Sequence, residues 1–378
     1  MLKVGIVAGE SSGDQLGAQL IRSLKTLKPD AVFYGMCGPK MREAGCQALA
    51  DVEQLSVMGI VEVARKYPQL RRLRSQLIAD LLSLDLDIFI GIDVPDFVHY
   101  IEDKLKQAGV KTVHYVAPQV WAWRPGRAKR LNKVVDLLLV LFPFEPDFFT
   151  RYGVNTSFVG HPLVSQIPNP VDRLGACQSV GVEPNKRYVA LMPGSRGQER
   201  RRHTRLFGQV ADALMTQIPD CEFLLGAVHE NAAAEIRTIL DGTPMFKKTT
   251  VVVHKSHEIL AISDAALVVS GTVTMEALVS KTPMVVAIRV AGLSYQILKR
   301  MIRTPFIAMP NVLAGREIVP EFVQDEASVD NLTRSMKKCV DDAGWRAEFD
   351  NNAEFLRKSL CPPGEHAAAK SVLNLINE

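Results

Sequence analysis

The sequence predicts an α/β protein with two doubly wound parallel sheets that face each other across a cleft. Apolar runs of strand length alternate with helical patterns through most of the chain. A strand also runs directly into a glycine-containing turn and a helix twice, first as VGIVAGESSGDQLGAQLIRSL and midway as YVALMPGSRGQERRRHTRLFGQV. The length of 378 residues suits two domains, because single cores stop growing at roughly 250 to 300 residues.

The first half carries six apolar runs that are separated by helical stretches, and we expect them to be the strands of one parallel sheet: VGIVAG, AVFYGM, DIFIGID, TVHYVAP, LLLVLF and FVGHPL. The proline-rich stretch from Gly160 to Asp172 loses periodicity and is expected to be a linker. We therefore predict a first domain over residues 1–165.

Alternation resumes after the linker, in the runs YVALMPG, CEFLLGAV, TVVVHK, AALVVSG and PMVVAIR, and helical patterns follow. These runs predict a second domain over residues 173–345. The helices of residues 346–378 are expected to pack back on the first domain or on a partner subunit.

Composition narrows the class of protein. The six cysteines form no C-x-x-C pair, which favours a reduced cytosol over an oxidising compartment. Residue 2 leads directly into the first expected strand, so no signal peptide is expected, and no apolar run approaches the ~20 residues of a membrane span. A soluble or peripheral protein is expected, and the net charge of +4 slightly favours anionic partners.

The two glycine-containing turns are typical of anion sites, because the first N–H groups of a helix lack intrahelical partners. Gly9, Gly13 and Gly17 are spaced four apart, unlike the dinucleotide fingerprint, and the sequence has no P-loop. NAD and ATP are therefore poor candidates for the ligand.

Acidic residues can be sorted by the end of the strand at which they lie, because ligands bind at the carboxyl ends of parallel strands. Asp85 and Asp87 come at the start of the strand DIFIGID, so we expect them to lie in solvent at its amino end. Asp93 follows that strand and is the candidate general base. Asp96 opens the next helix and could be its N-terminal cap.

The second half places Ser270, Gly271 and Thr272 at a strand-to-helix turn, with Glu276 about one helical turn later. Backbone N–H groups and hydroxyls there could hold a diphosphate, and the carboxylate could accept the hydroxyls of a ribose. An ordinary helix cap with a solvated glutamate has equal weight. Arg196 is the best-placed cation for a departing nucleoside diphosphate.

Two stretches could contact a membrane, the acceptor substrate or a nucleic acid. Met58, Ile60, Val61 and Val63 lie beside many cations and are expected to touch an anionic bilayer. WAWRPGRAKRLNK mixes aromatic and basic residues and could line an acceptor site. Without a recognised nucleic-acid module, no nucleic-acid partner is expected.

The string from Gly9 to Gly13 also satisfies G-x-S-x-G, the turn of serine hydrolases, in which Ser11 would be the nucleophile. In that fold several strands precede the turn. Only eight residues precede it here, so hydrolysis is a distant alternative.

Nine motifs, taken in order, closely resemble those of the lipid A disaccharide synthases of Gram-negative bacteria: VAGESSGDQLGA, MGIVEV, GIDVPDF, VAPQVWAWR, FPFE, FVGHP, MPGSRGQE, SGTVTMEAL and PNVLAGRE. The resemblance spans residue 4 to about residue 317. It implies two Rossmann-like domains, the GT-B architecture. It also implies an inverting hexosyltransferase that joins UDP-2,3-diacylglucosamine to 2,3-diacylglucosamine 1-phosphate through a β-1,6 linkage and releases UDP.

The resemblance assigns roles that agree with the reading of the residues. Asp93 would be the base and Arg196 would act on the diphosphate. Substrate and nucleotide would be bound by Ser12, Ser270, Gly271, Thr272, Glu276 and Asn311, with Glu10, Asp14 and Asp96 as secondary candidates. Ser11 stands where alanine is more usual in the motif.

The same resemblance implies neither metal nor cofactor, because the UDP-sugar is itself the donor. It further implies peripheral association with the cytoplasmic face of the inner membrane, and it allows a homodimer. The alternatives are another GT-B enzyme acting on UDP-N-acetylglucosamine, either a peptidoglycan-type transferase or a 2-epimerase, and a lipid-binding protein without turnover.

Overall fold

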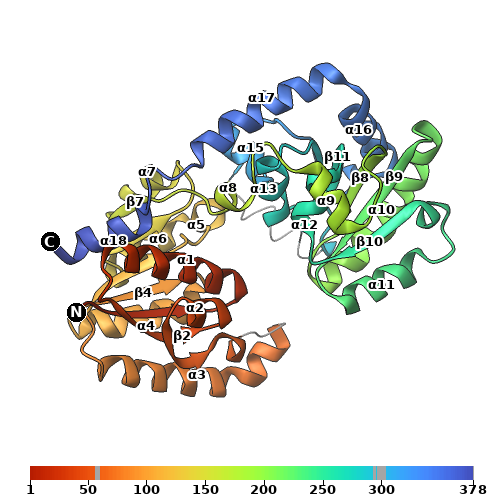
Figure 1. Ribbon diagram of the computed structural model, residues 1–378. Helices are drawn as coiled ribbons and strands as arrows, with labels where there is room; N and C mark the ends of the chain where they lie inside the picture. Colours follow the sequence, from red (N-terminus) through yellow and green to blue (C-terminus); the bar gives the residue numbers. More distant parts are fainter. Residues whose placement is uncertain (56–59, 293–294, 296–303, 378) are drawn as a thin grey trace. The chain divides into compact units, whose positions relative to one another are not determined.

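The computed structural model describes residues 1–55, 60–292, 295 and 304–377, with the backbone alone for residues 60–66. The chain divides into two compact units (Figure 1). Unit 1 comprises Met1–Pro162 and Leu360–Glu378, and unit 2 comprises Leu163–Ser359. The second segment of unit 1 therefore comes from the far end of the sequence.

The described part of unit 1 contains a seven-stranded parallel sheet with the order β3-β2-β1-β4-β5-β6-β7. Its strands are β1 (Lys3–Ala8), β2 (Val32–Cys37), β3 (Cys46–Asp51), β4 (Ile88–Ile92), β5 (Lys111–Tyr115), β6 (Leu137–Val140) and β7 (Thr156–Phe158). The central strands are apolar on both faces because helices cover both, as in doubly wound sheets generally.

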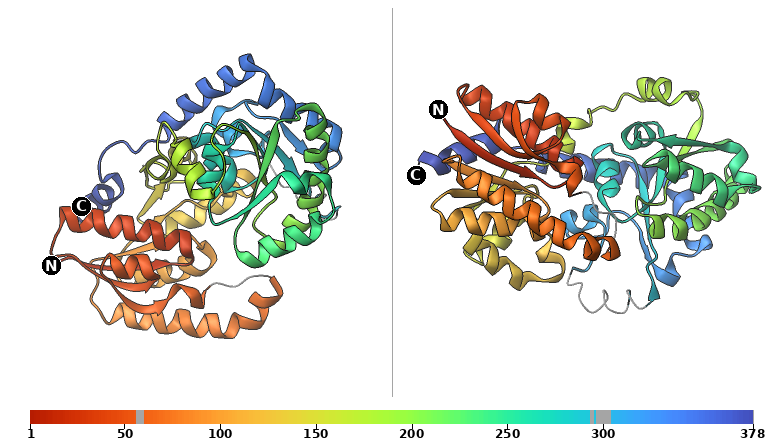
Figure 2. Two further views of the ribbon diagram at one scale, coloured as in Figure 1. Left: turned by 45° about the vertical axis from the view of Figure 1, so that its right-hand side comes forward. Right: turned by 90° about the horizontal axis from the view of Figure 1, so that it is seen from below.

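Helices cover the two faces of this sheet separately. Side chains of α1 (Ser11–Leu27) and α18 (Ala367–Asn377) pack with Val4 and Ile6 of β1. Those of α3 (Ile60–Leu82) and α4 (Pro95–Gln107) pack with Val7 on the opposite face. Figures 1 and 2 show α18 beside α1. The remaining helical elements are α2 (Pro39–Glu43), η1 (Val52–Gln54), α5 (Val120–Trp123), η2 (Pro125–Arg127), α6 (Ala128–Val134) and α7 (Glu145–Thr150).

The described part of unit 2 contains a six-stranded parallel sheet with the order β10-β9-β8-β11-β12-β13. Its strands are β8 (Arg187–Met192), β9 (Cys221–Ala227), β10 (Thr249–Val253), β11 (Ala265–Val269), β12 (Met284–Ile288) and β13 (Glu321–Val323). Its helices are α8 (Leu163–Gln166), α9 (Arg173–Val180), α10 (Gly197–Gln217), α11 (Glu230–Leu240), η3 (Pro244–Lys248), α12 (Ser256–Ile262), α13 (Thr272–Val279), α15 (Met309–Ala314), η4 (Gln324–Glu326), α16 (Val329–Asp341) and α17 (Ala343–Ser359). The prediction of two doubly wound parallel sheets is thereby confirmed.

Two details differ from the sequence prediction. The run FVGHPL is not a strand: β7 ends at Phe158, and the left-handed φ of +83° at Gly160 lies just beyond it. The stretch expected to be an irregular linker contains the short helix α8. Both differences concern short segments in which glycine and proline mask the local pattern.

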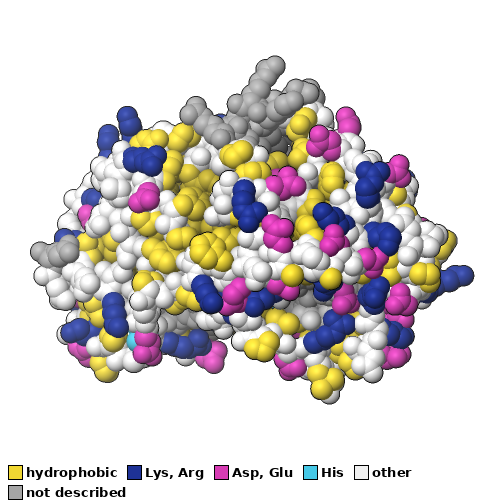
Figure 3. All heavy atoms as spheres, turned by 90° about the horizontal axis from the view of Figure 1, so that it is seen from above, with side chains coloured by type: hydrophobic (Ala, Val, Ile, Leu, Met, Phe, Trp, Pro, Cys, Tyr) yellow, Lys and Arg dark blue, Asp and Glu magenta, His cyan; other side chains and the backbone are white. Residues whose placement is uncertain are grey.

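The surface charges and the helices can be compared with what a polyanion partner or a membrane crossing would require. In Figure 3 acidic and basic side chains are interspersed over the right-hand part of the visible face, so neither sign dominates there. Leu77 and Leu81 of α3 are buried against the sheet, so the apolar side of this helix after Pro68 belongs to the core. Among the helices that the structure describes, none combines the length and apolarity that a membrane crossing requires.

Candidate functional site

The turn after β1 and the turn after β4 are built against each other in unit 1. Strand β1 pairs with β2 on one side and with β4 on the other, so the connections leave in opposite directions at this point. Such a switch point is where doubly wound sheets bind ligands. A Cβ added to Gly9 would lie 2.2 Å from Cγ2 of Val94. Glycine at residue 9 is therefore required by the close approach of the two turns.

Asp93 occupies a strained turn at the carboxyl end of β4. Both Asp93, with φ of +53°, and Val94, with φ of +43°, adopt left-handed backbone conformations, which are rare for a β-branched residue such as valine. The Asp93 N–H donates to the carbonyl of Tyr115 at 3.0 Å, and its Oδ1 accepts from the Val94 N–H at 2.8 Å. Strain of this kind costs on the order of 1–3 kcal/mol and clusters at functional sites.

The other acidic candidates of unit 1 differ in their accessibility. Glu10 and Ser12 are exposed at the start of α1, where the Ser12 hydroxyl donates to Oε1 of Glu10 at 3.1 Å. Asp96 is exposed in the first turn of α4, but Val94 is the residue at the N-cap position. The suggestion that Asp96 caps this helix is therefore wrong.

Asp14 has a structural role that the sequence analysis missed. Its side chain is only 3% exposed. Its carboxylate accepts hydrogen bonds from the N–H groups of Gly38, Lys40 and Met41 at 2.8, 3.0 and 3.1 Å. Because the carboxylate satisfies the N-terminal donors of α2, Asp14 is not free to contact a substrate, and its place among the binding candidates is corrected.

The two predicted diphosphate turns lie at neighbouring strands of unit 2. Strand β8 pairs with β9 and with β11, so the turn ending at Arg196 and the turn at Ser270 and Gly271 share one edge of the sheet at its switch point. The N-terminal N–H groups of α10 and α13 open at these turns. Among the described residues, the space that a Cβ of Gly271 would occupy is open.

The arginines at the start of α10 have different roles. Arg196 is exposed at the N-cap of α10. Arg200 is buried: it pairs with Glu235 through Nε at 2.8 Å and donates to the Ser195 carbonyl at 3.0 Å. Arg201 also pairs with Glu235. Arg200 is therefore not part of a solvated helix face, and it braces the turn that carries Arg196.

Glu276 offers an unused acceptor one turn into α13. Its side chain is 16% exposed, and Oε2 lies 3.9 Å from Nε2 of His257. Among the described residues this buried Oε2 has no hydrogen-bond partner. Buried polar groups usually have a partner, so this carboxylate can accept hydrogen bonds from the hydroxyls of a ligand.

Asn311 is committed to the protein itself. Its side chain is fully buried, accepts from the N–H groups of Ile318 and Val319, and donates to Glu321 at 2.7 Å. Burial raises the pKa of the Glu321 carboxyl, which also accepts from the N–H groups of Ile307 and Ala308. Because Ser270 Oγ donates to the Ile307 carbonyl at 3.4 Å, Asn311 supports the Ser270 turn. The predicted contact between its side chain and the nucleotide is corrected.

The predicted membrane-facing residues cannot be placed, and one histidine with a structural role was not predicted. Met58 lies outside the described residues, and the side chains of Ile60, Val61 and Val63 are likewise not described. Sequence reasoning missed His203, whose Nδ1–H donates to the Glu199 carbonyl at 2.8 Å while Nε2 accepts from the Arg289 N–H at 3.0 Å. His203 thus links α10 to the backbone at Arg289. A histidine inside a basic helical stretch gives no sequence signal for such a structural link.

A family model described as lipid-A-disaccharide synthetase matches residues 4–361. The chain belongs to the lipid-A-disaccharide synthetase family. The lipid-A-disaccharide synthase of Pseudomonas aeruginosa strain UCBPP-PA14 is 44% identical over 375 residues, which cover 99% of this chain and 98% of that protein. The synthase of Pseudomonas putida strain F1 is 44% identical over 378 residues, covering 100% of this chain and 99% of that protein.

Solved structures are similar in fold. The S. aureus MnaA–UDP co-structure has a TM-score of 0.66 at 13% identity, with 100% of this chain and 98% of that chain covered. CalG4, the calicheamicin glycosyltransferase, has a TM-score of 0.61 at 13% identity, with 100% and 99% covered. These likenesses confirm the GT-B fold, and family membership makes the chain a glycosyltransferase of lipid A biosynthesis. The hydrolase and 2-epimerase alternatives are not favoured.

Proposed function

We propose that this family member joins UDP-2,3-diacylglucosamine to 2,3-diacylglucosamine 1-phosphate through a β-1,6 linkage and releases UDP. In this proposal unit 1 binds the acceptor and supplies the base, and unit 2 binds the donor nucleotide. The relatives are lipid-A-disaccharide synthases, which supports the product class, and a solved structure of this fold with UDP supports a UDP-linked donor.

Asp93 is the proposed base. Its carboxylate would take the proton of the acceptor's primary hydroxyl as that oxygen attacks the anomeric carbon from the face opposite UDP. A positioned base of this kind contributes about 10²–10⁴-fold to the rate. The observation that carries the proposal is the strained turn at Asp93, which is held against the turn after β1. Ser12 at that turn would help to hold the acceptor or the diphosphate.

The donor nucleotide would be held at the switch point of unit 2. Arg196 and the N–H groups at Ser270, Gly271 and Thr272 would offset the charge that grows on the departing diphosphate, as electrostatic preorganisation requires. The free acceptor of Glu276 would receive the ribose hydroxyls. Asn311 and Arg200 would position these turns without touching the ligand. The proposal needs no cofactor besides the donor itself.

The lipid chains of both substrates imply a membrane source. We propose peripheral association with the cytoplasmic face of the inner membrane through the apolar residues Met58, Ile60, Val61 and Val63. A homodimer is also proposed from the family resemblance, with the C-terminal helices as its contact.

The deciding experiment incubates the purified full chain with both acylated sugars and measures UDP. UDP release is expected only when both acylated substrates are present. Release of UDP from the donor without acceptor, or equal use of UDP-N-acetylglucosamine, would reject the proposed reaction. Saturable lipid binding with no UDP release at any enzyme concentration would favour a lipid-binding protein instead.

A further inference from the structure

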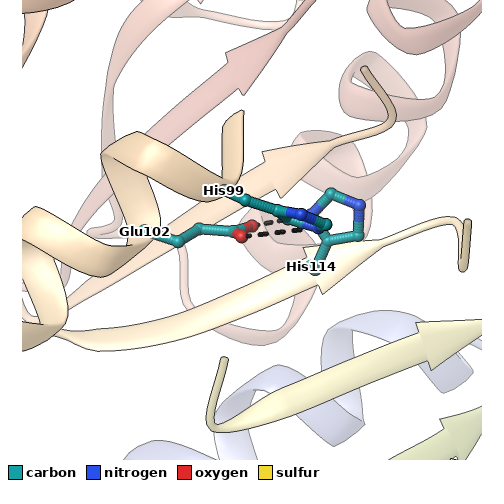
Figure 4. Close-up of side chains that lie close together, drawn as sticks. All are labelled: His99, Glu102 and His114. Carbon is teal, nitrogen blue, oxygen red and sulfur yellow. Dashed lines mark hydrogen bonds and ion pairs between the residues drawn. The ribbon is translucent and has the colours of Figure 1, made fainter. Parts of the chain in front are cut away.

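Three side chains that could ligate a metal converge inside unit 1. His99 and Glu102 lie one turn apart on α4, and His114 lies on the adjacent strand β5 (Figure 4). The side chains of Glu102 and His114 are fully buried, and that of His99 is 16% exposed. His114 Nδ1 lies 2.7 Å from Glu102 Oε1, and His99 Nε2 lies 4.0 Å from Glu102 Oε2.

The hydrogen bonds of the described residues leave this cluster incomplete. His99 Nε2, Glu102 Oε2 and His114 Nε2 are all buried and have no hydrogen-bond partner among those residues. Buried polar atoms in native proteins normally have one. The unpartnered His99 Nε2 and Glu102 Oε2, which lie 4.0 Å apart, therefore point to a bound group that the hydrogen bonds do not account for.

The backbone makes room for the carboxylate. A Cβ on Gly91, which pairs with His114 across β4 and β5, would lie 2.5 Å from Glu102 Oε1. The rings of His99 and His114 lie with their centroids 4.6 Å apart at an interplanar angle of 57°. Helix α4 and strand β5 thus place both imidazoles beside the Glu102 carboxylate.

We infer that His99, Glu102 and His114 form a binding site for one divalent transition-metal ion of the Zn²⁺ class. Two imidazoles and one carboxylate are a ligand set that zinc accepts, with a remaining position for water. One ligand atom from each residue lies within 4.8 Å of the others. Tetrahedral ligands at about 2.1 Å from zinc lie roughly 3.4 Å apart. The observed separations, 2.7 Å from His114 Nδ1 to Glu102 Oε1 and 4.0 Å from His99 Nε2 to Glu102 Oε2, each differ from this value by less than about 1 Å.

Binding rearranges one contact. The metal takes the place of the proton that joins His114 Nδ1 to Glu102, and the ring carries its single proton on Nε2 instead, so that a neutral imidazole and a carboxylate bind the ion. The partial exposure of His99 provides the entry path.

The surrounding charges set the strength of the site. Lys106 acts on Glu102 and Arg130 acts on His99, and both cations oppose a metal ion. Lys106, however, is paired with Asp136 at 2.8 Å. With one carboxylate as its anionic ligand, the site is expected to bind zinc more weakly than thiolate sites do. Its role is structural, because it ties α4 to β5 beneath the Asp93 turn.

Titration calorimetry of the full chain with Zn²⁺, after treatment with EDTA and dialysis, tests the inference. One ion per chain is expected. His99→Ala should weaken this binding by at least about tenfold, and it is the least disruptive variant because His99 is the most exposed ligand. The matched control is His366→Ala, which removes an imidazole 3.5 Å from the Glu365 carboxylate in the same unit.

Binding that is lost in the His99 variant and kept in the His366 variant supports the site. Equal binding by both variants and the parent, or no stoichiometric binding by the parent, overturns it. Co²⁺ provides a second readout that does not depend on variants. Visible absorption bands of an ordered Co²⁺ site are expected in the parent and should disappear in His99→Ala, and their absence from the parent overturns the inference.

Discussion

The backbone of Gly9 approaches Val94 so closely that a single added methyl would come within 2.2 Å of the valine side chain. The first turn of the chain and the turn that carries Asp93 therefore hold each other in place. Gly9→Ala should force them apart and destabilise unit 1 by about 1–3 kcal/mol, as overpacking does. Urea unfolding measures this loss. Gly126→Ala is the control, since open space surrounds that position, and a comparable loss in the control would contradict the explanation.

Asp93→Asn should reduce turnover by about 10²–10⁴-fold while the fold and UDP binding persist. Asparagine keeps the acceptor oxygen that receives the Val94 N–H but cannot take up a proton. Steady-state UDP release is the measurement. Asp147→Asn, an exposed change in the first turn of α7 in the same unit, should leave the rate nearly unchanged. Near-parental turnover by the Asp93 variant would remove this residue from the mechanism.

Glu276→Gln should weaken UDP binding by roughly 10- to 100-fold, because hydrogen bonds to a charged group contribute about 1.5–3 kcal/mol. The reason is the unused Oε2 acceptor. Calorimetry with UDP measures the affinity. Glu230→Gln, at the exposed start of α11 in the same unit, is the control. If both variants bind UDP equally well, the ribose role of Glu276 is wrong.

Acid should weaken unit 2 through His203. Burial lowers the pKa of this histidine, so the folded state keeps the ring neutral while the unfolded chain takes up a proton near pH 6.5. Stability is therefore present above about pH 6.5 and is lost as the pH falls toward the folded pKa. Melting temperatures at pH 7.5 and 5.5 should differ less in His203→Gln than in the parent or in His254→Gln, an exposed control. An unchanged pH difference would exclude His203 as the cause.

Replacing Met58, Val61 and Val63 together with serine should release the chain from vesicles that contain anionic lipid, without lowering its melting temperature. Apolar area and nearby cations would otherwise act together at the membrane surface. Vesicle co-sedimentation measures this. Leu174→Ser, which alters an exposed leucine of unit 2, should have no effect. Unchanged sedimentation of the triple variant would assign those residues to another role.

The sheets could be predicted because buried parallel strands are continuous apolar runs. The turns could be predicted because glycine residues follow these runs. Asp93 could be placed for the same reason, since its strand is unmistakable. The structural roles of Asp14 and Asn311 could not be predicted, because a motif does not reveal whether a polar side chain faces a ligand or the protein's own N–H groups. The strand β3 escaped prediction because its sequence, CQALAD, alternates too weakly.

The last helix has a consequence for how the chain is made. Residues of α18, among them Ala369, Val372 and Leu375, complete the core that begins with β1. Helix α1 covers part of this apolar face early, but the part that α18 covers stays exposed to solvent until synthesis is nearly finished. A nascent chain stalled before Leu360 should be a substrate for chaperones, and a shortened transcript should yield a protein that aggregates.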